Sequence, residues 1–169
     1  RGAYAIGSLG YDINGIYTGK TTKASGDYSV AIGLGAEANQ FGAMALGLNV
    51  SASSYAATAM GSGSRAIGSY SMATGYNSEA YGEGATALGF ETEASGRASL
   101  ATGVSTRAAG DFSTAIGYVT EASGKYSAAT GYFTTAPSGY ETAVGCYNSI
   151  YTPNSSTGWD SGDRLFVIG

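Results

Sequence analysis

Small and apolar residues recur along the chain with a period of seven. Alanine occupies position 24 and every seventh position after it up to 143, which makes eighteen alanines without a gap. Glycine follows two residues later in all but three cases, the exceptions being Gln40, Ser54 and Ser138. A coiled coil needs large apolar residues at two heptad positions and few glycines, so this pattern disfavours a helix. It predicts short strands joined by tight turns.

The structural unit is predicted to be fourteen residues, because alternate seven-residue halves differ. In the half that contains Ala31, the residues two before, at and two after the alanine are small, as in Ser29, Ala31 and Gly33. Side chains alternate between the two faces of a strand, so these three share one face. That face is predicted to point into a narrow coil with little room for large side chains.

The opposite face of this half is apolar, whereas the other half is mostly polar there. Eight of nine coils carry Val, Ile, Leu or Met beside the alanine of the first half, and the second half carries residues such as Glu37 and Lys23. A continuous apolar stripe on a solenoid needs to be covered, which predicts self-association. The predicted interface residues are Val30, Ile32, Met44, Leu46, Met60, Met72, Leu88, Leu100, Ile116 and Val144.

The order of charged residues supports a fourteen-residue stack. Coils in register place residue i beside residue i+14, about 4.8 Å away. Opposite charges then face each other along two columns. The first column is Glu93, Arg107 and Glu121, and the second is Glu83, Arg97, Asp111 and Lys125.

Three segments are expected. Residues 1–23 form irregular N-terminal coils, in which residues 5–7 and 17–19 look like repeat elements twelve apart. Residues 24–145 form about nine coils, a rod of roughly 43 Å. Residues 146–169 form a C-terminal loop and a connector strand toward a downstream domain. The chain opens at Arg1 without Met, so we expect it to be a piece of a longer protein.

Composition excludes several classes of function. A net charge of −4 disfavours a nucleic-acid binder, and no apolar run approaches the roughly 18 residues of a membrane helix, so no direct membrane insertion is expected. Histidine is absent, and Cys146 has no evident activating base. The segment GSGSRAIG at 61–68 lacks the Lys-Ser/Thr ending of a phosphate loop, and no calcium-solenoid motif occurs. We therefore predict no enzyme activity, no cofactor and no metal.

Several segments resemble a known family. SGDYSVAIG (25–33), AGDFSTAIG (109–117) and ASGKYSAATG (122–131) are similar to the head repeat of YadA-like trimeric autotransporter adhesins. The resemblance implies an all-β fold, a left-handed parallel β-roll with two strands in each 14-residue coil, and three rolls packed into a homotrimer. It also implies an extracellular fibre, either anchored in the outer membrane of a bacterium or carried by a virion.

The resulting functional hypothesis is a structural and adhesive segment of a trimeric surface fibre. Its partner would be a receptor, matrix protein or glycan of a target cell. The alternatives are a shaft segment of a phage tail-fibre-like protein and, as a weaker rival, an ice-binding β-solenoid. Candidate ligand contacts are Trp159, in a loop beyond the repeat, and a column of aromatic rings spaced by multiples of fourteen residues: Tyr76, Phe90, Tyr118 and Tyr132.

Overall fold

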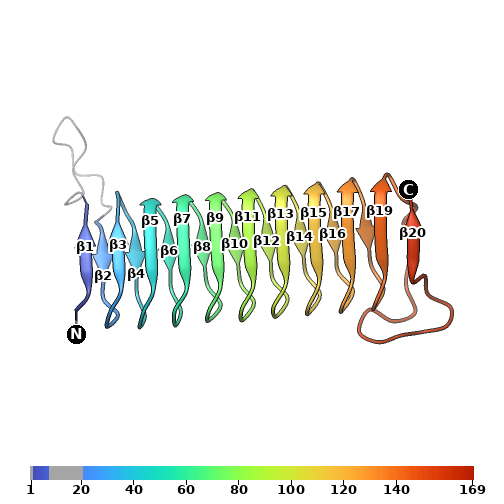
Figure 1. Cartoon of the computed structure of the whole chain (residues 1–169), viewed down its shortest axis with the longest axis horizontal. Coiled ribbons are helices and arrows are strands. Elements are labelled where there is room, and N and C mark those ends of the chain that lie inside the picture. The colour runs from blue at the N-terminus through green and yellow to red at the C-terminus, as the bar shows by residue number, and fades with distance from the viewer. Residues whose placement is uncertain (1, 8–20) are drawn as a thin grey trace.

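The fold is a β-solenoid, and successive strands alternate between two parallel sheets (Figure 1). The computed structural model describes residues 2–7 and 21–169. Within these ranges the chain forms strands, turns and bends but no helix. The coils stack along one axis with the two chain ends at opposite ends of the rod (Figure 1). The all-β architecture, the parallel strands and the fourteen-residue coil are confirmed.

One sheet holds eleven strands of up to five residues, and we call it the long-strand sheet. Its strands are β1 (Tyr4–Ile6), β3 (Val30–Ile32), β5 (Met44–Leu48), β7 (Thr58–Ser62), β9 (Met72–Tyr76), β11 (Thr86–Phe90), β13 (Leu100–Val104), β15 (Thr114–Tyr118), β17 (Ala128–Tyr132), β19 (Thr142–Cys146) and β20 (Phe166–Ile168).

The other sheet holds nine strands of two residues, and we call it the short-strand sheet. Its strands are β2 (Lys23–Ala24), β4 (Glu37–Ala38), β6 (Ser51–Ala52), β8 (Arg65–Ala66), β10 (Glu79–Ala80), β12 (Glu93–Ala94), β14 (Arg107–Ala108), β16 (Glu121–Ala122) and β18 (Thr135–Ala136).

Neighbouring strands keep the predicted register. Ala87 lies beside Ala101, and the same offset of fourteen recurs from β2 to β19. The first strand differs, because Ala5 of β1 lies beside Ala31 with an offset of twenty-six. The predicted repeat element at 5–7 is therefore part of the long-strand sheet. The element predicted at 17–19 lies outside the described residues.

The interior is a ladder of small side chains. Each repeat alanine from Ala31 to Ala143 has no exposed surface. The flanking inward positions hold Ser, Ala or Thr, and Val50 is the largest aliphatic side chain among the fully buried residues. Because alanine buries little apolar area, this core contributes less hydrophobic free energy per residue than a core of Leu and Ile.

Glycine two residues after the repeat alanine is required by the close approach of the next coil. A Cβ on Gly89 would lie 2.0 Å from the carbonyl oxygen of Gly103, and the φ angle of Gly89 is +134°. Any larger residue would therefore collide with the backbone of the neighbouring strand.

The corners of each coil continue the hydrogen-bonded ladder. At one corner a β-turn closes through a bond such as that from the Ser71 amide to the Gly68 carbonyl, at 3.2 Å. The residue before Ser71 in the same turn bonds to the coil before it, as the amide of Tyr70 donates to the carbonyl of Tyr55 at 2.8 Å. Strand and corner amides therefore both find partners in adjacent coils. This pairing is needed because a buried amide without a hydrogen-bond partner costs free energy.

The C-terminal segment closes the last coil. Asn148 takes the place of a further short strand, since its side-chain amide donates to the Thr135 carbonyl at 2.8 Å and its oxygen accepts from the Thr135 amide at 2.7 Å. The predicted strand near the C-terminus is present as β20, which pairs with β19 and so extends the long-strand sheet. Residues 153–163 form the predicted loop.

One buried charge breaks the rule of a small interior. Glu141 occupies the inward position that Ser127 holds one coil earlier, and it is fully buried. Its carboxylate accepts hydrogen bonds from the Ser138 amide and hydroxyl at 3.1 and 3.0 Å, and it pairs with Arg164 at 3.2 Å. Arg164 in turn lies over the Tyr151 ring, 4.1 Å from its centroid. The pair fastens the C-terminal segment to the end of the roll.

Two glycine variants test the packing between coils. Gly89→Ala should destabilise the chain by more than about 4 kcal/mol or prevent folding, because the new methyl group meets a backbone carbonyl. Gly84→Ala is the matched control, since a Cβ there has no neighbour within 4 Å although φ is +66°. It should cost about 1 kcal/mol, the penalty of the left-handed conformation. Thermal unfolding followed by circular dichroism measures both, and equal losses would contradict the packing argument.

Removing one partner of the Glu141–Arg164 pair tests the closure of the last coil. Arg164→Met should destabilise the protein by about 3 kcal/mol, because it leaves a buried carboxylate without its counter-charge. The double variant with Glu141→Ser restores the residue type of the preceding coil and should recover most of that loss. Chemical denaturation measures the coupling. Additive losses in the double variant would show that the pair does not hold the end of the roll.

Candidate functional site

The outward side of the long-strand sheet forms a broad apolar surface, which we call the apolar face. In each coil three side chains point outward around the buried alanine and glycine, as Thr86, Leu88 and Phe90 do around Ala87 in β11. All ten residues predicted at an interface lie on this face: Val30, Ile32, Met44, Leu46, Met60, Met72, Leu88, Leu100, Ile116 and Val144.

The apolar face remains accessible in the single chain. Ile32 is 39% exposed, Met72 is 41% exposed and Ile116 is 38% exposed. Continuous backbone pairing from β3 to β19 places such side chains in adjacent columns along the rod. A soluble monomer rarely exposes a contiguous apolar surface of this kind unless it is an interaction site.

The predicted aromatic column forms one edge of the apolar face. Tyr76 stacks on Phe90 with ring centroids 4.9 Å apart, and Tyr118 stacks on Tyr132 at 5.1 Å. The parallel pairing places Val104 between the two pairs. A hydrogen bond with Tyr147, together with partial burial, raises the pKa of the Tyr132 hydroxyl. The candidate ligand contacts and the predicted interface residues therefore share one surface.

The structure also shows a second set of rings, which the sequence analysis missed. Tyr28, Tyr70, Phe112, Tyr126 and Tyr140 occupy the left-handed position of the β-turn at one corner, and we call them the corner column. Phe112, Tyr126 and Tyr140 stack with centroid distances of 5.0 Å. Their spacing of fourteen residues was visible in the sequence, but aromatic residues rarely adopt a positive φ, so nothing local marks them as corner residues.

Charged side chains on the short-strand sheet form the predicted alternating column. Arg107 pairs with Glu93 at 3.3 Å and with Glu121 at 3.0 Å, and Arg65 pairs with Glu79 at 3.0 Å. Tyr81 donates a hydrogen bond to Glu79, which raises the pKa of the tyrosine hydroxyl. These groups are substantially exposed, so each pair contributes at most about 1 kcal/mol to stability. Their partners agree with the fourteen-residue register.

The second predicted charge column does not form a series of ion pairs. The Arg97 guanidinium lies over the Phe112 ring at 4.9 Å, and the Lys125 ammonium lies over the Tyr126 ring at 5.2 Å. Asp111 accepts a hydrogen bond from the backbone amide of Arg97 instead of its side chain. These two cations therefore lie against aromatic rings of the corner column.

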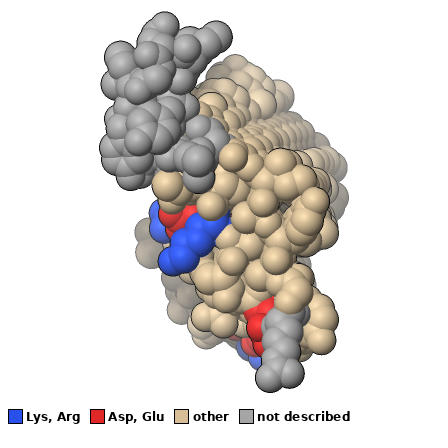
Figure 2. Space-filling view, turned by 90° about the vertical axis from the view of Figure 1, so that its left-hand side faces the viewer, with Lys and Arg blue, Asp and Glu red and all other residues tan. Residues whose placement is uncertain are grey.

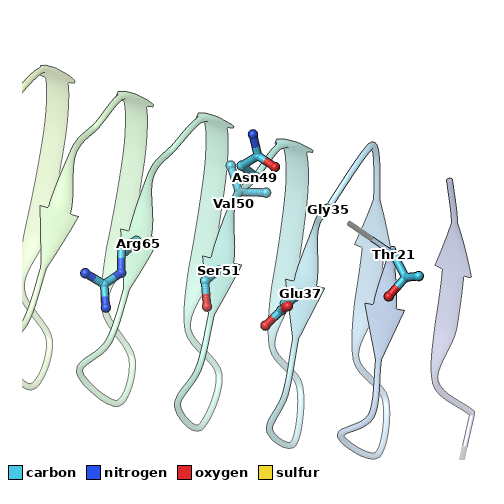
Figure 3. Close-up of a pocket in the computed structure, with 7 residues that line it drawn as sticks. All are labelled: Thr21, Gly35, Glu37, Asn49, Val50, Ser51 and Arg65. Atoms are coloured by element: carbon cyan, nitrogen blue, oxygen red, sulfur yellow. The ribbon is translucent and has the colours of Figure 1, made fainter. Parts of the chain in front are cut away.

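Two surface hollows lie beside the short-strand sheet and its adjoining corner. One, of about 320 Å³, extends over successive coils, with Glu37, Ser51 and Arg65 contributed by β4, β6 and β8 (Figure 3). Viewed from the N-terminal end, the surface is mostly uncharged, with a few small groups of charged side chains (Figure 2). A second hollow of about 390 Å³ near the C-terminal end is lined in part by Val119, Phe133 and Ile150.

Across 2–7 and 21–169, no three metal-ligating side chains of the His, Cys, Asp and Glu types gather into a potential metal site. Cys146 is a free, exposed thiol. The same ranges contain no helix with the length and hydropathy to cross a membrane. Trp159 is 62% exposed in the C-terminal loop, so it stays available as a contact residue.

Comparison with known families agrees with this geometry. The YadA head domain repeat, described by a model that spans two copies of the repeat, matches residues 19–36, 24–49, 52–78, 66–92 and 94–120. No curated protein sequence matches the chain. The matched ranges together cover more than half of the sequence and coincide with coils from β2 to β15. The chain therefore belongs to the YadA head domain repeat family.

Proposed function

We propose that the chain is a structural and adhesive segment of a trimeric fibre that attaches a bacterium to the surface of another cell. The family supports an adhesin-like segment of a trimeric autotransporter, since YadA-like heads in general form homotrimers and bind ligands on host surfaces. It is a structural and adhesive family, not one of enzymes. The observation that carries the proposal is the apolar face, which runs the length of the roll.

The apolar face is the surface on which three copies meet. Its side chains are half-buried or exposed in the single chain, and the interior supplies mostly Ala, Ser, Thr and Gly to the core. Burying Val, Leu, Ile and Met against other copies would add the hydrophobic free energy that the narrow interior lacks. Residues such as Ile32, Leu46 and Leu88 would then form a second, intermolecular core.

The corners and the short-strand sheet are left for contact with a target. A rod with repeated surfaces gains strength from several weak contacts made at once, and three copies triple each of them. The target is a receptor, a matrix protein or a glycan, and the fibre is extracellular and anchored in the outer membrane. Trp159, in the C-terminal loop, is the predicted contact that lies outside the apolar face. The rings of Tyr76, Phe90, Tyr118 and Tyr132 form the edge of that face, so they contact a target only where the trimer leaves this edge open.

Ice binding finds no support in the arrangement of threonines. Thr92, Thr106 and Thr120 form a column at spacing fourteen, but each is only 1% exposed. On the apolar face, Thr102 lies between Leu88 and Ile116 of the neighbouring strands. A flat, exposed threonine array is therefore missing from the described coils.

The mass of the protein in solution tests the trimer. Light scattering should give about three times the 16.9 kDa of one chain. A mass of one or two chains would contradict the trimeric packing.

Charged substitutions test which face lies at the interface. The triple variant Ile32→Asp, Leu46→Asp and Leu88→Asp should lose the trimer and unfold or aggregate, because three carboxylates would be buried without partners. The matched control is Ser25→Asp, Ser53→Asp and Ser95→Asp, three outward positions beside the short-strand sheet that should leave the mass unchanged. Retention of the parent mass by the first variant would place the interface elsewhere.

A further inference from the structure

The corner column is interrupted twice, and the two interruptions differ. Gly42 and Ala56 leave the first gap, between Tyr28 and Tyr70. Rings from the adjoining position fill it. Phe41 lies 5.4 Å from Tyr28, Phe41 and Tyr55 stack at 5.2 Å, and Tyr55 lies 5.4 Å from Tyr70. The aromatic surface is therefore continuous across the first gap.

The second interruption stays open. Gly84 and Ala98 leave a gap between Tyr70 and Phe112, and the adjoining positions hold Glu83 and Arg97 in place of rings. A hollow of about 310 Å³ results, lined by Tyr70, Glu83, Gly84, Arg97, Ala98 and Phe112. We call it the corner notch.

The corner notch combines aromatic walls with one donor and one acceptor group. Tyr70 is 62% exposed at one end, and at the other end the Arg97 guanidinium lies over the Phe112 ring. The ring holds the planar guanidinium in place while its N–H groups remain able to donate. The Glu83 carboxylate has no hydrogen bond or ion pair within the described residues, so its oxygens are free to accept.

We propose that the corner notch binds one neutral pyranose ring of a cell-surface glycan. The apolar C–H face of the sugar would pack on Tyr70, and neighbouring hydroxyl groups would bridge Arg97 and Glu83. Hydrogen bonds to charged groups are stronger than neutral ones, and they fix the orientation of the ring. The carboxylate of Glu83 disfavours an acidic sugar at the same place. This inference names a ligand class for the attachment role proposed above and rests on that role.

A single notch this open should bind weakly, with a Kd of about 1 mM. Three copies on one fibre raise the apparent affinity for a surface that carries many glycans. Weak single sites are therefore compatible with firm attachment.

Binding can be measured by saturation-transfer NMR with the methyl pyranosides of galactose, glucose and mannose as probes. At least one should give a saturable signal with the parent protein. Tyr70→Ala should weaken it by at least about tenfold, and Tyr28→Ala should leave it unchanged. Tyr28 is the matched control because it is 64% exposed at the same corner position and lies outside the notch, three coils before Tyr70.

Filling the notch gives a sharper test. Ala98→Tyr places a ring beside Phe112 at a position whose φ of 50° is close to that of Tyr126, 59°. The variant should fold as stably as the parent and lose sugar binding. Sugar binding that survives Ala98→Tyr would overturn the assignment of the notch.

A parent protein of trimeric mass that binds none of the three pyranosides would overturn the sugar proposal while the fibre proposal stands. A monomeric parent that binds sugar through Tyr70 would overturn the trimeric fibre proposal while the sugar proposal stands.

Discussion

Backbone contact between successive coils is the constraint on which the rest of this structure depends. Amides of strands and corners bond to the neighbouring coil at 2.7–3.5 Å, from β1 to the Asn148 side-chain amide that ends the short-strand sheet. The coils approach so closely that a Cβ on Gly89 would lie 2.0 Å from the carbonyl oxygen of Gly103. Glycine is therefore imposed by backbone packing, and alanine by the narrow space between the two sheets.

Because the interior is narrow, side chains on the outside of the roll have to supply much of the hydrophobic stabilisation. The buried alanines contribute little hydrophobic free energy, so the large side chains that a globular protein would place inside lie on the apolar face. The exposed apolar face follows from the same geometry that makes the core thin. In the trimer that we propose, fold and oligomer are linked because each chain places its largest aliphatic residues where another copy can cover them.

The repeat also orders the surface into columns, because each outward residue lies beside its equivalents in the coils before and after. Stacked rings suit this spacing, as the centroid distances of about 5 Å in the corner column show. A column made this way is sensitive to single residues. Where Gly84 and Ala98 replace rings, and Glu83 and Arg97 stand beside them, the same geometry leaves the corner notch.

The sequence by itself determined the coil length, the register and the two faces, because the alanine ladder is periodic and a strand has only two sides. It also predicted Arg107 between Glu93 and Glu121, whose side chains have no competing partner. Where several partners compete for one side chain, or a partner comes from outside the repeat, only the tertiary structure decided which contact forms. Arg97 has Phe112 and Glu83 within the same few coils and lies over the ring. Arg164 reaches Glu141 because β20 returns to pair with β19. Periodicity fixes which columns exist, but side-chain packing in three dimensions selects the contacts between columns.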